Sequence, residues 1–171
     1  MVISFFSVSF FIMIVGMALG ALLGLKIWYV FPHFSVFVGL ICFSSLVVGA
    51  ISGVTIFDWL PLVVIRIIII FICIGIVIYF YHLYHPSYGY IPYRGFVHWS
   101  ILLFLFFFIG IEFAIIGFSL WLFIILLPIF LVSLFIGTFF IWKGKGSRMM
   151  GRFIVFLPLL LFLFIGLVKL I

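Results

Sequence analysis

The sequence predicts an all-α, polytopic integral membrane protein with five or six transmembrane helices. Of its 171 residues, 71% are hydrophobic and only 6% are charged, too few polar side chains to cover a water-soluble domain. At least five apolar runs reach about 20 residues, the length at which a helix spans a bilayer core of roughly 30 Å. The runs are continuous, whereas strands of a membrane barrel alternate in polarity.

We expect a single transmembrane domain over residues 1–171. The hydropathy pattern predicts its helices at about 3–25, 34–55, 60–80, 100–121, 123–142 and 153–170. In the first, Gly16, Gly20 and Gly24 recur every four residues and share one helix face. Small residues at this spacing let another helix approach closely inside a membrane, so this face is predicted to be a packing surface.

The second and third predicted helices each follow a proline-containing connector. Pro32 precedes the second, and "FDWLP" precedes the third, where Asp58 and Pro61 suit a helix cap and first turn. The third helix contains Arg66, about six residues from its start. An arginine at that depth can extend its charged end toward the membrane interface.

The stretch from 81 to 99 is the longest polar segment and holds His82, His85 and His98. A metal site is one interpretation, but Pro86 interrupts any helix that would present the first two histidines together. Neither a carboxylate nor a thiolate lies nearby in the sequence. We therefore predict an interfacial loop with aromatic anchors, and no metal site.

From Ser100 to Trp142 the chain is apolar apart from Glu112 and Pro128. One helix of that length would extend about 65 Å. The run is therefore either two helices with a turn near Pro128, which we expect, or one helix followed by a membrane-bound segment.

Basic residues support a count of six helices. Cytoplasmic or matrix loops of membrane proteins are enriched in Lys and Arg. If Lys26, Arg94 and the cluster at 143–152 share that side, an even number of crossings separates Arg94 from Lys143.

Glu112 is one of only two acidic residues, and it lies about 12 residues beyond Ser100, roughly 18 Å along a helix. A carboxylate inside a membrane requires a polar partner, water or a proton. Three interpretations are open: a proton relay, a structural ion pair with Arg66, or a neutral side chain in a packed core. Asp58 is a further candidate for the same relay or pairing role.

Other site chemistry is not indicated. Cys42 and Cys73 lie in apolar runs and are expected to be small buried side chains. No Ser/His/Asp set, phosphate-binding glycine loop or metal-ligand cluster indicates catalysis by the chain alone. The net charge of +6 lies mostly in one short segment, which favours membrane orientation over nucleic-acid binding.

The whole chain resembles chain 6 of mitochondrial NADH:ubiquinone oxidoreductase, respiratory complex I. The shared features are a proline before the second helix, an acidic entry to the third ("GVTIFDW"), a carboxylate in the fourth ("IGIEFAIIGFSLW") and a basic turn before a closing apolar helix ("GRFIVFLPLLLFLFIGL"). That family has five helices, and its third helix usually carries Tyr-x-Gly-Ala, the site of a π-bulge. This chain reads "IRIII" there.

The resemblance implies a non-catalytic subunit of the mitochondrial inner membrane that helps couple ubiquinone reduction to proton translocation. Its partners would be lipids and other membrane subunits of the respiratory chain, and the electron-transport cofactors would lie on other chains, none on this one. The absence of Asn and Gln and the presence of 27 Phe fit a T-biased coding strand, common in organelle genomes, and equally fit selection for a membrane sequence alone. The alternative is another organellar respiratory-chain or ATP-synthase membrane subunit with a structural role. A stand-alone transporter or channel is less favoured, because two carboxylates offer little for a substrate site.

Overall fold

The computed structural model describes residues 2–24, 31–85, 90, 96–119, 121–145 and 151–170. These residues form six helices: α1 (Val2–Gly24), α2 (Phe31–Thr55), α3 (Leu62–Leu83), α4 (Phe96–Ile115), α5 (Leu122–Lys145) and α6 (Gly151–Val168). The all-α prediction is confirmed, and each helix overlaps one of the predicted ranges.

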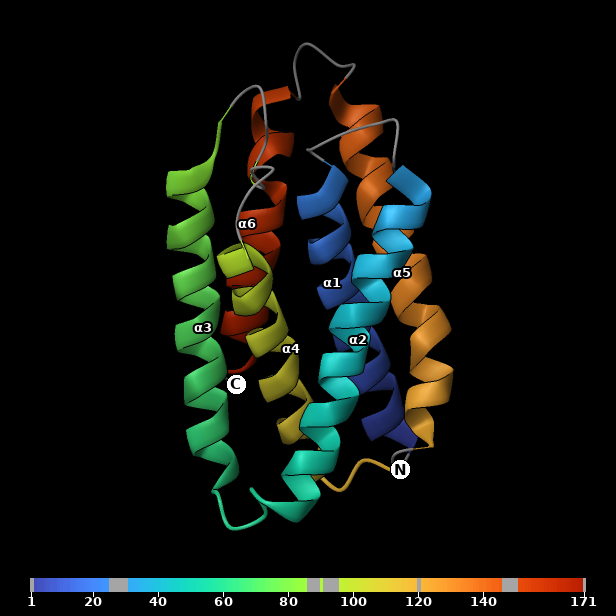
Figure 1. The fold of residues 1–171 in the computed structure, drawn as a ribbon, viewed down its shortest axis with the longest axis vertical. Coiled ribbons are helices and arrows are strands. Elements are labelled where there is room, and N and C mark those ends of the chain that lie inside the picture. The colour runs from blue at the N-terminus through green and yellow to red at the C-terminus, as the bar shows by residue number, and fades with distance from the viewer. Residues whose placement is uncertain are drawn as a thin grey trace.

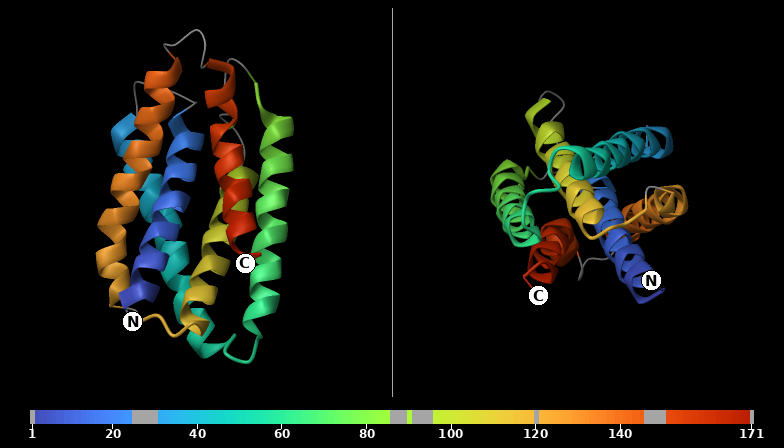
Figure 2. Two further views of the ribbon diagram at one scale, coloured as in Figure 1. Left: turned by 180° about the vertical axis from the view of Figure 1, so that it is seen from behind. Right: turned by 90° about the horizontal axis from the view of Figure 1, so that it is seen from below.

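Successive helices run in opposite directions along one bundle (Figure 1). The turn at 56–61 and the described residues 116–119 therefore lie at the same end as the start of α1, and we call this the short-turn end. Seen along the bundle, α3 and α6 lie on one side and α2 and α5 on the other (Figure 2). Helix α1 is the most enclosed, with 67% of its apolar span buried against 22% for α3.

Two pairs of helices that run in the same direction, α1 with α5 and α2 with α4, form the closest contacts. A Cβ added at Gly20 would collide with the backbone oxygen of Leu134 on α5, and one added at Gly16 would collide with Ser133. A Cβ added at Gly24 would lie 3.2 Å from the Cα of Thr138. The predicted packing face of α1 is thus confirmed, and α5 is the helix that occupies it.

Glycines also allow close backbone contact between α2 and α4. A Cβ added at Gly49 would meet the backbone oxygen of Phe107, and one added at Gly110 would meet that of Leu46. The hydroxyl of Ser45 donates a hydrogen bond of 2.8 Å to the backbone oxygen of Leu103. Such close packing of backbones is a main source of helix association in lipid. The hydrophobic effect contributes little there, because lipid tails are as apolar as the helix surfaces.

The prediction of a turn near Pro128 is wrong, because α4 ends at Ile115 and Pro128 lies inside α5. Gly117 ends α4 with a φ of 83°, a conformation that glycine adopts without steric cost. The N–H of Phe118 bonds to the oxygen of Phe113, and that of Gly117 to the oxygen of Ala114, which is the Schellman pattern. Proline inside a membrane helix is tolerated when neighbouring groups satisfy the freed backbone.

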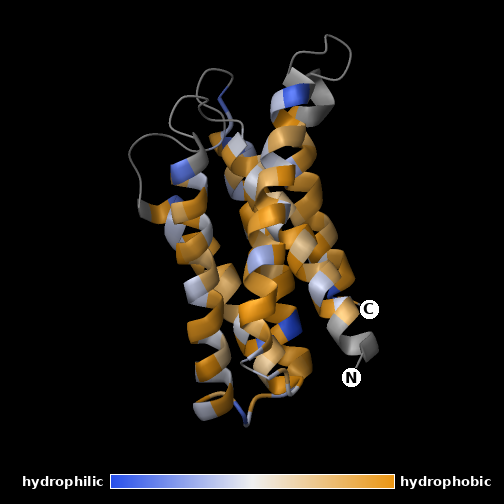
Figure 3. Cartoon of the chain, turned by 90° about the vertical axis from the view of Figure 1, so that its right-hand side faces the viewer, coloured by the Kyte–Doolittle hydropathy of each residue, from blue (hydrophilic) through white to orange (hydrophobic). Residues whose placement is uncertain are grey.

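Five of the helices are long and apolar enough to cross a membrane, and α6 adds a shorter apolar helix from Val155 to Val168. Hydrophobic residues cover most of the helical surface (Figure 3). The chain is therefore a multi-pass membrane protein. Lys26 and Arg94, on which the predicted orientation partly depended, lie outside the described residues, whereas Lys143 is exposed near the end of α5.

This arrangement predicts opposite accessibility for the two ends of α5. With Cys42 and Cys73 replaced by Ala, single cysteines at Asp58 and Trp121 should react with an impermeant maleimide from one side of the membrane. A cysteine at Lys143 should react only from the other side, because one helix separates residues 121 and 143. Labelling of positions 121 and 143 from the same side would contradict the fold.

Candidate functional site

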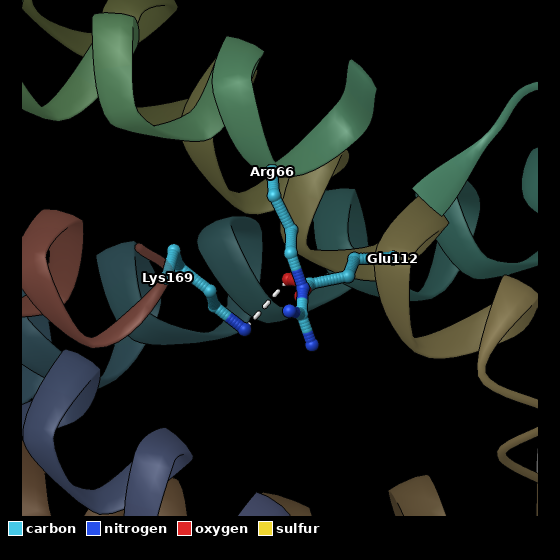
Figure 4. A network of polar contacts seen from close by, with 3 residues as sticks. All are labelled: Arg66, Glu112 and Lys169. Atoms are coloured by element: carbon cyan, nitrogen blue, oxygen red, sulfur yellow. Dashed lines mark hydrogen bonds and ion pairs between the residues drawn. The ribbon is translucent and has the colours of Figure 1, made fainter. Parts of the chain in front are cut away.

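Three charged side chains from three helical segments meet near the short-turn end (Figure 4). Arg66 on α3 donates through Nε to Oε1 of Glu112 on α4, at 3.3 Å. Lys169, immediately after α6, places Nζ 2.6 Å from Oε2 of the same carboxylate. We call Arg66, Glu112 and Lys169 the ion cluster.

The three members differ in burial. The side chain of Glu112 is 0% exposed, that of Lys169 is 10% exposed and that of Arg66 is 36% exposed. Each oxygen of the buried carboxylate thus faces one cation, which offsets part of the cost of removing the charge from water. The ion-pair interpretation correctly brings Arg66 to Glu112, and Lys169 is an additional partner.

The position of Glu112 along the bundle differs from the sequence estimate. Counted from Ser100 it is deep in an apolar run, but α4 ends at Ile115, three residues beyond it. The carboxylate therefore lies about 4.5 Å from that end of the helix. It is withdrawn from water by neighbouring side chains, since its exposure is zero, and not by depth along its own helix.

Lys169 is the site residue that sequence reasoning missed. It stands at the end of the last apolar run, where a lysine ordinarily extends into water. In the structure its Nζ lies 3.8 Å from the centre of the Phe11 ring on α1, a cation–π contact. The sequence does single out Lys169 in one respect: only 6% of the residues are charged, so a lysine next to an apolar run is unusual here.

A cavity of about 200 Å³ adjoins the ion cluster, and we call it the cluster cavity. All three charged side chains line it, together with Ser7, Phe10 and other side chains of α1. The cavity has room for several water molecules of about 30 Å³ each. Glu112 and Lys169 are therefore largely withdrawn from the surface, beside a space that polar molecules can occupy.

The other predicted candidates lie elsewhere. Asp58 is exposed in the turn between α2 and α3, and the residue that caps α3 is Pro61. His82 and His85 are exposed, whereas His98 is buried on α4 with Nδ1 2.6 Å from the Tyr79 hydroxyl. Among the described residues, no three His, Cys, Asp or Glu side chains form a group that could hold a metal ion.

Cys42 and Cys73 are both buried and free, as predicted. The ion cluster is thus the main charged feature of the described interior. It places one carboxylate between two cations beside a cavity. Comparison of the chain with protein-family models, curated proteins and solved structures finds no match.

Proposed function

We propose that this chain is a non-catalytic membrane subunit of a proton-translocating NADH:ubiquinone oxidoreductase, in the mitochondrial inner membrane. The observation that carries the proposal is Glu112, a fully buried carboxylate paired with two cations beside a cavity. Ionisable groups inside membrane proteins are rare, and they commonly mark proton or ion pathways. The resemblance to chain 6 supports the same assignment, since that family carries a carboxylate in its fourth helix.

The ion cluster supplies a way to couple movement to protonation. While Arg66 and Lys169 lie close, they supply two counter-charges to the carboxylate of Glu112. If α3 or α6 moved away during turnover, the buried carboxylate would lose a counter-charge and take up a proton. Water in the cluster cavity would deliver that proton. The redox cofactors and the quinone site would lie on other chains.

The chain differs from the chain 6 family in two features that bear on where coupling would occur. The described residues contain six helices, where the family has five. Helix α3 is α-helical from Leu62 to Leu83, with Arg66 near the place of the family's Tyr-x-Gly-Ala tyrosine. The coupling role is therefore assigned to the ion cluster and not to a π-bulge in α3.

A structural role in another organellar respiratory-chain or ATP-synthase assembly is the second candidate. Its favouring observation is that both carboxylate oxygens of Glu112 already face cations, as in an ion pair that links helices. In either assembly, the exposed apolar face of α3, including Val63, Phe71 and Ile78, would meet lipids or neighbouring subunits.

Native electrophoresis of detergent-solubilised membranes, followed by mass spectrometry of the band that contains this chain, tests the assignment. We expect the chain to co-migrate with NADH dehydrogenase subunits and to be enriched with NADH-oxidising activity. Migration with ATP-synthase subunits alone would favour the second candidate. Migration as a free protein would contradict both.

A further inference from the structure

We propose that the cluster cavity binds the phosphate group of an anionic phospholipid, with Arg66 and Lys169 as its ligands. This site is independent of any respiratory role, because it rests on the charge balance, shape and rim of the cavity. It would draw a lipid from the leaflet at the short-turn end of the bundle.

The charge balance of the ion cluster favours an anion. Two cations face a single carboxylate, so the three side chains together carry one excess positive charge. Lys169 is nine-tenths buried, where an uncompensated charge is costly. A negatively charged group in the cavity would balance the cluster.

Arg66 has donors available for such a group. Among the described residues, Arg66 contacts Glu112 through Nε, at 3.3 Å. In Figure 4 the far end of the guanidinium extends past the carboxylate, away from α3. An arginine fork matches the geometry of phosphate oxygens and can donate two hydrogen bonds to them. Ser7 also lines the cavity.

The rim of the cavity distinguishes a lipid from a free anion. Phe10, Ile116 and Val168 line the cavity, and each also exposes a large part of its side chain, 61%, 45% and 38% respectively. These surfaces can contact acyl chains while the phosphate reaches the cations. Glu112 is three residues from the end of α4, so the cluster lies close to the level of lipid headgroups. Basic pockets between membrane helices are known to bind anionic headgroups.

The test measures lipid binding to the purified full-length chain by native mass spectrometry in a neutral detergent. The probes are dioleoyl phosphatidylglycerol and dioleoyl phosphatidylcholine, titrated separately. We expect the anionic lipid to bind at least about tenfold more tightly, since charge-assisted hydrogen bonds contribute on that scale. Equal binding of the two lipids would overturn the proposal.

Three variants locate the site. Arg66→Gln should weaken phosphatidylglycerol binding about tenfold, whereas Lys143→Gln, which removes a positive charge near the other end of α5, should leave it unchanged. Ser7→Trp keeps all three charges but fills the cavity, so it should also abolish the preference and decides the matter if Arg66→Gln does not fold. Unchanged binding in Ser7→Trp would overturn the site. Displacement of the lipid by millimolar inorganic phosphate would show a free-anion site and overturn the lipid assignment.

Discussion

Gly20→Leu should prevent α1 from packing on α5 and should leave little folded protein. Even a single Cβ at this position would collide with the backbone oxygen of Leu134 and lie 2.8 Å from its carbonyl carbon. Backbone atoms of a helix cannot rotate away as a flexible side chain can, so the whole of α5 would have to move. The displacement would also break the 3.1 Å hydrogen bond from the Thr138 hydroxyl to the oxygen of Gly20.

The expected loss exceeds the 1–3 kcal/mol or so typical of an overpacked core, because the contact is reciprocal. Gly137 on α5 lies against Met17 on α1, where an added Cβ would come 2.9 Å from the carbonyl carbon. Separation of the helices at Gly20 therefore loses contacts over several turns. The measurement is the midpoint of SDS-induced unfolding in mixed micelles, with Gly20→Ala expected between wild type and Gly20→Leu.

Gly75→Leu is the matched control, since a Cβ at Gly75 on α3 meets nothing within 4 Å. Replacement of this glycine should leave the unfolding midpoint unchanged or raise it slightly, because leucine favours helix more than glycine does. Equal effects at Gly20 and Gly75 would mean that helix propensity, and not the α1–α5 contact, determines the loss.

Sequence patterns were sufficient for the helical class and the order of the helices, and they left five or six helices open. Continuous apolar runs of membrane-spanning length have few alternative structures, because every backbone group in lipid must be bonded internally. The glycine repeat at Gly16, Gly20 and Gly24 also predicted a close contact on α1. It could not predict α5 as the partner, since apolar helices offer similar side chains and the reciprocal glycine of α5, Gly137, is not part of a four-residue glycine repeat.

The turn between α4 and α5 shows how two local signals compete. Pro128 predicts a break in the apolar run, yet it lies inside α5. Gly117, followed by Phe118, carried the correct signal, because glycine after a helix end with an apolar residue next is the sequence form of the Schellman motif. A search for helix C-terminal glycines would have placed the turn correctly.

The sequence predicted two of the three members of the ion cluster, Glu112 and Arg66, but not Lys169. Rarity of charge drew attention to Glu112 and Arg66, and their pairing was one of three interpretations. Lys169 could not be assigned by spacing, because its contact with Glu112 joins residues 57 positions apart in sequence (169 minus 112). Only the packing of α6 against α1 and α3 brings this lysine inward.

Glu112→Gln should have the largest effect of any change in the ion cluster. It leaves two cations, one of them nine-tenths buried, without their counter-charge. Removal of one partner from a buried ion pair costs about 3–5 kcal/mol, whereas replacement of all members by neutral groups is often tolerated. We therefore expect the unfolding midpoint to fall sharply in Glu112→Gln and to recover when Arg66→Gln and Lys169→Gln are added.

The two variants that each remove one cation should lower the unfolding midpoint by different amounts. Lys169→Gln should destabilise more than Arg66→Gln, because Lys169 is closer to the carboxylate, at 2.6 Å against 3.3 Å, and is the less exposed of the two. Arg66→Gln leaves Glu112 paired with Lys169. Double-mutant cycles for each pair isolate the coupling free energy from effects of the individual substitutions. Zero coupling in both cycles would show that the three charges do not stabilise one another.

Glu112→Gln also distinguishes a proton relay from a purely structural ion pair. A glutamine preserves the shape of Glu112 but cannot exchange a proton, so a relay requires its carboxylate even in a complex that assembles normally. In membranes where assembly is retained, we expect Glu112→Gln to lower proton pumping per NADH oxidised, and the assembled triple-neutral variant to pump equally poorly. Restored assembly together with restored pumping in the triple variant would assign the cluster a structural role. Normal pumping in an assembled Glu112→Gln complex would exclude the relay outright, because the proposed proton acceptor would then be dispensable.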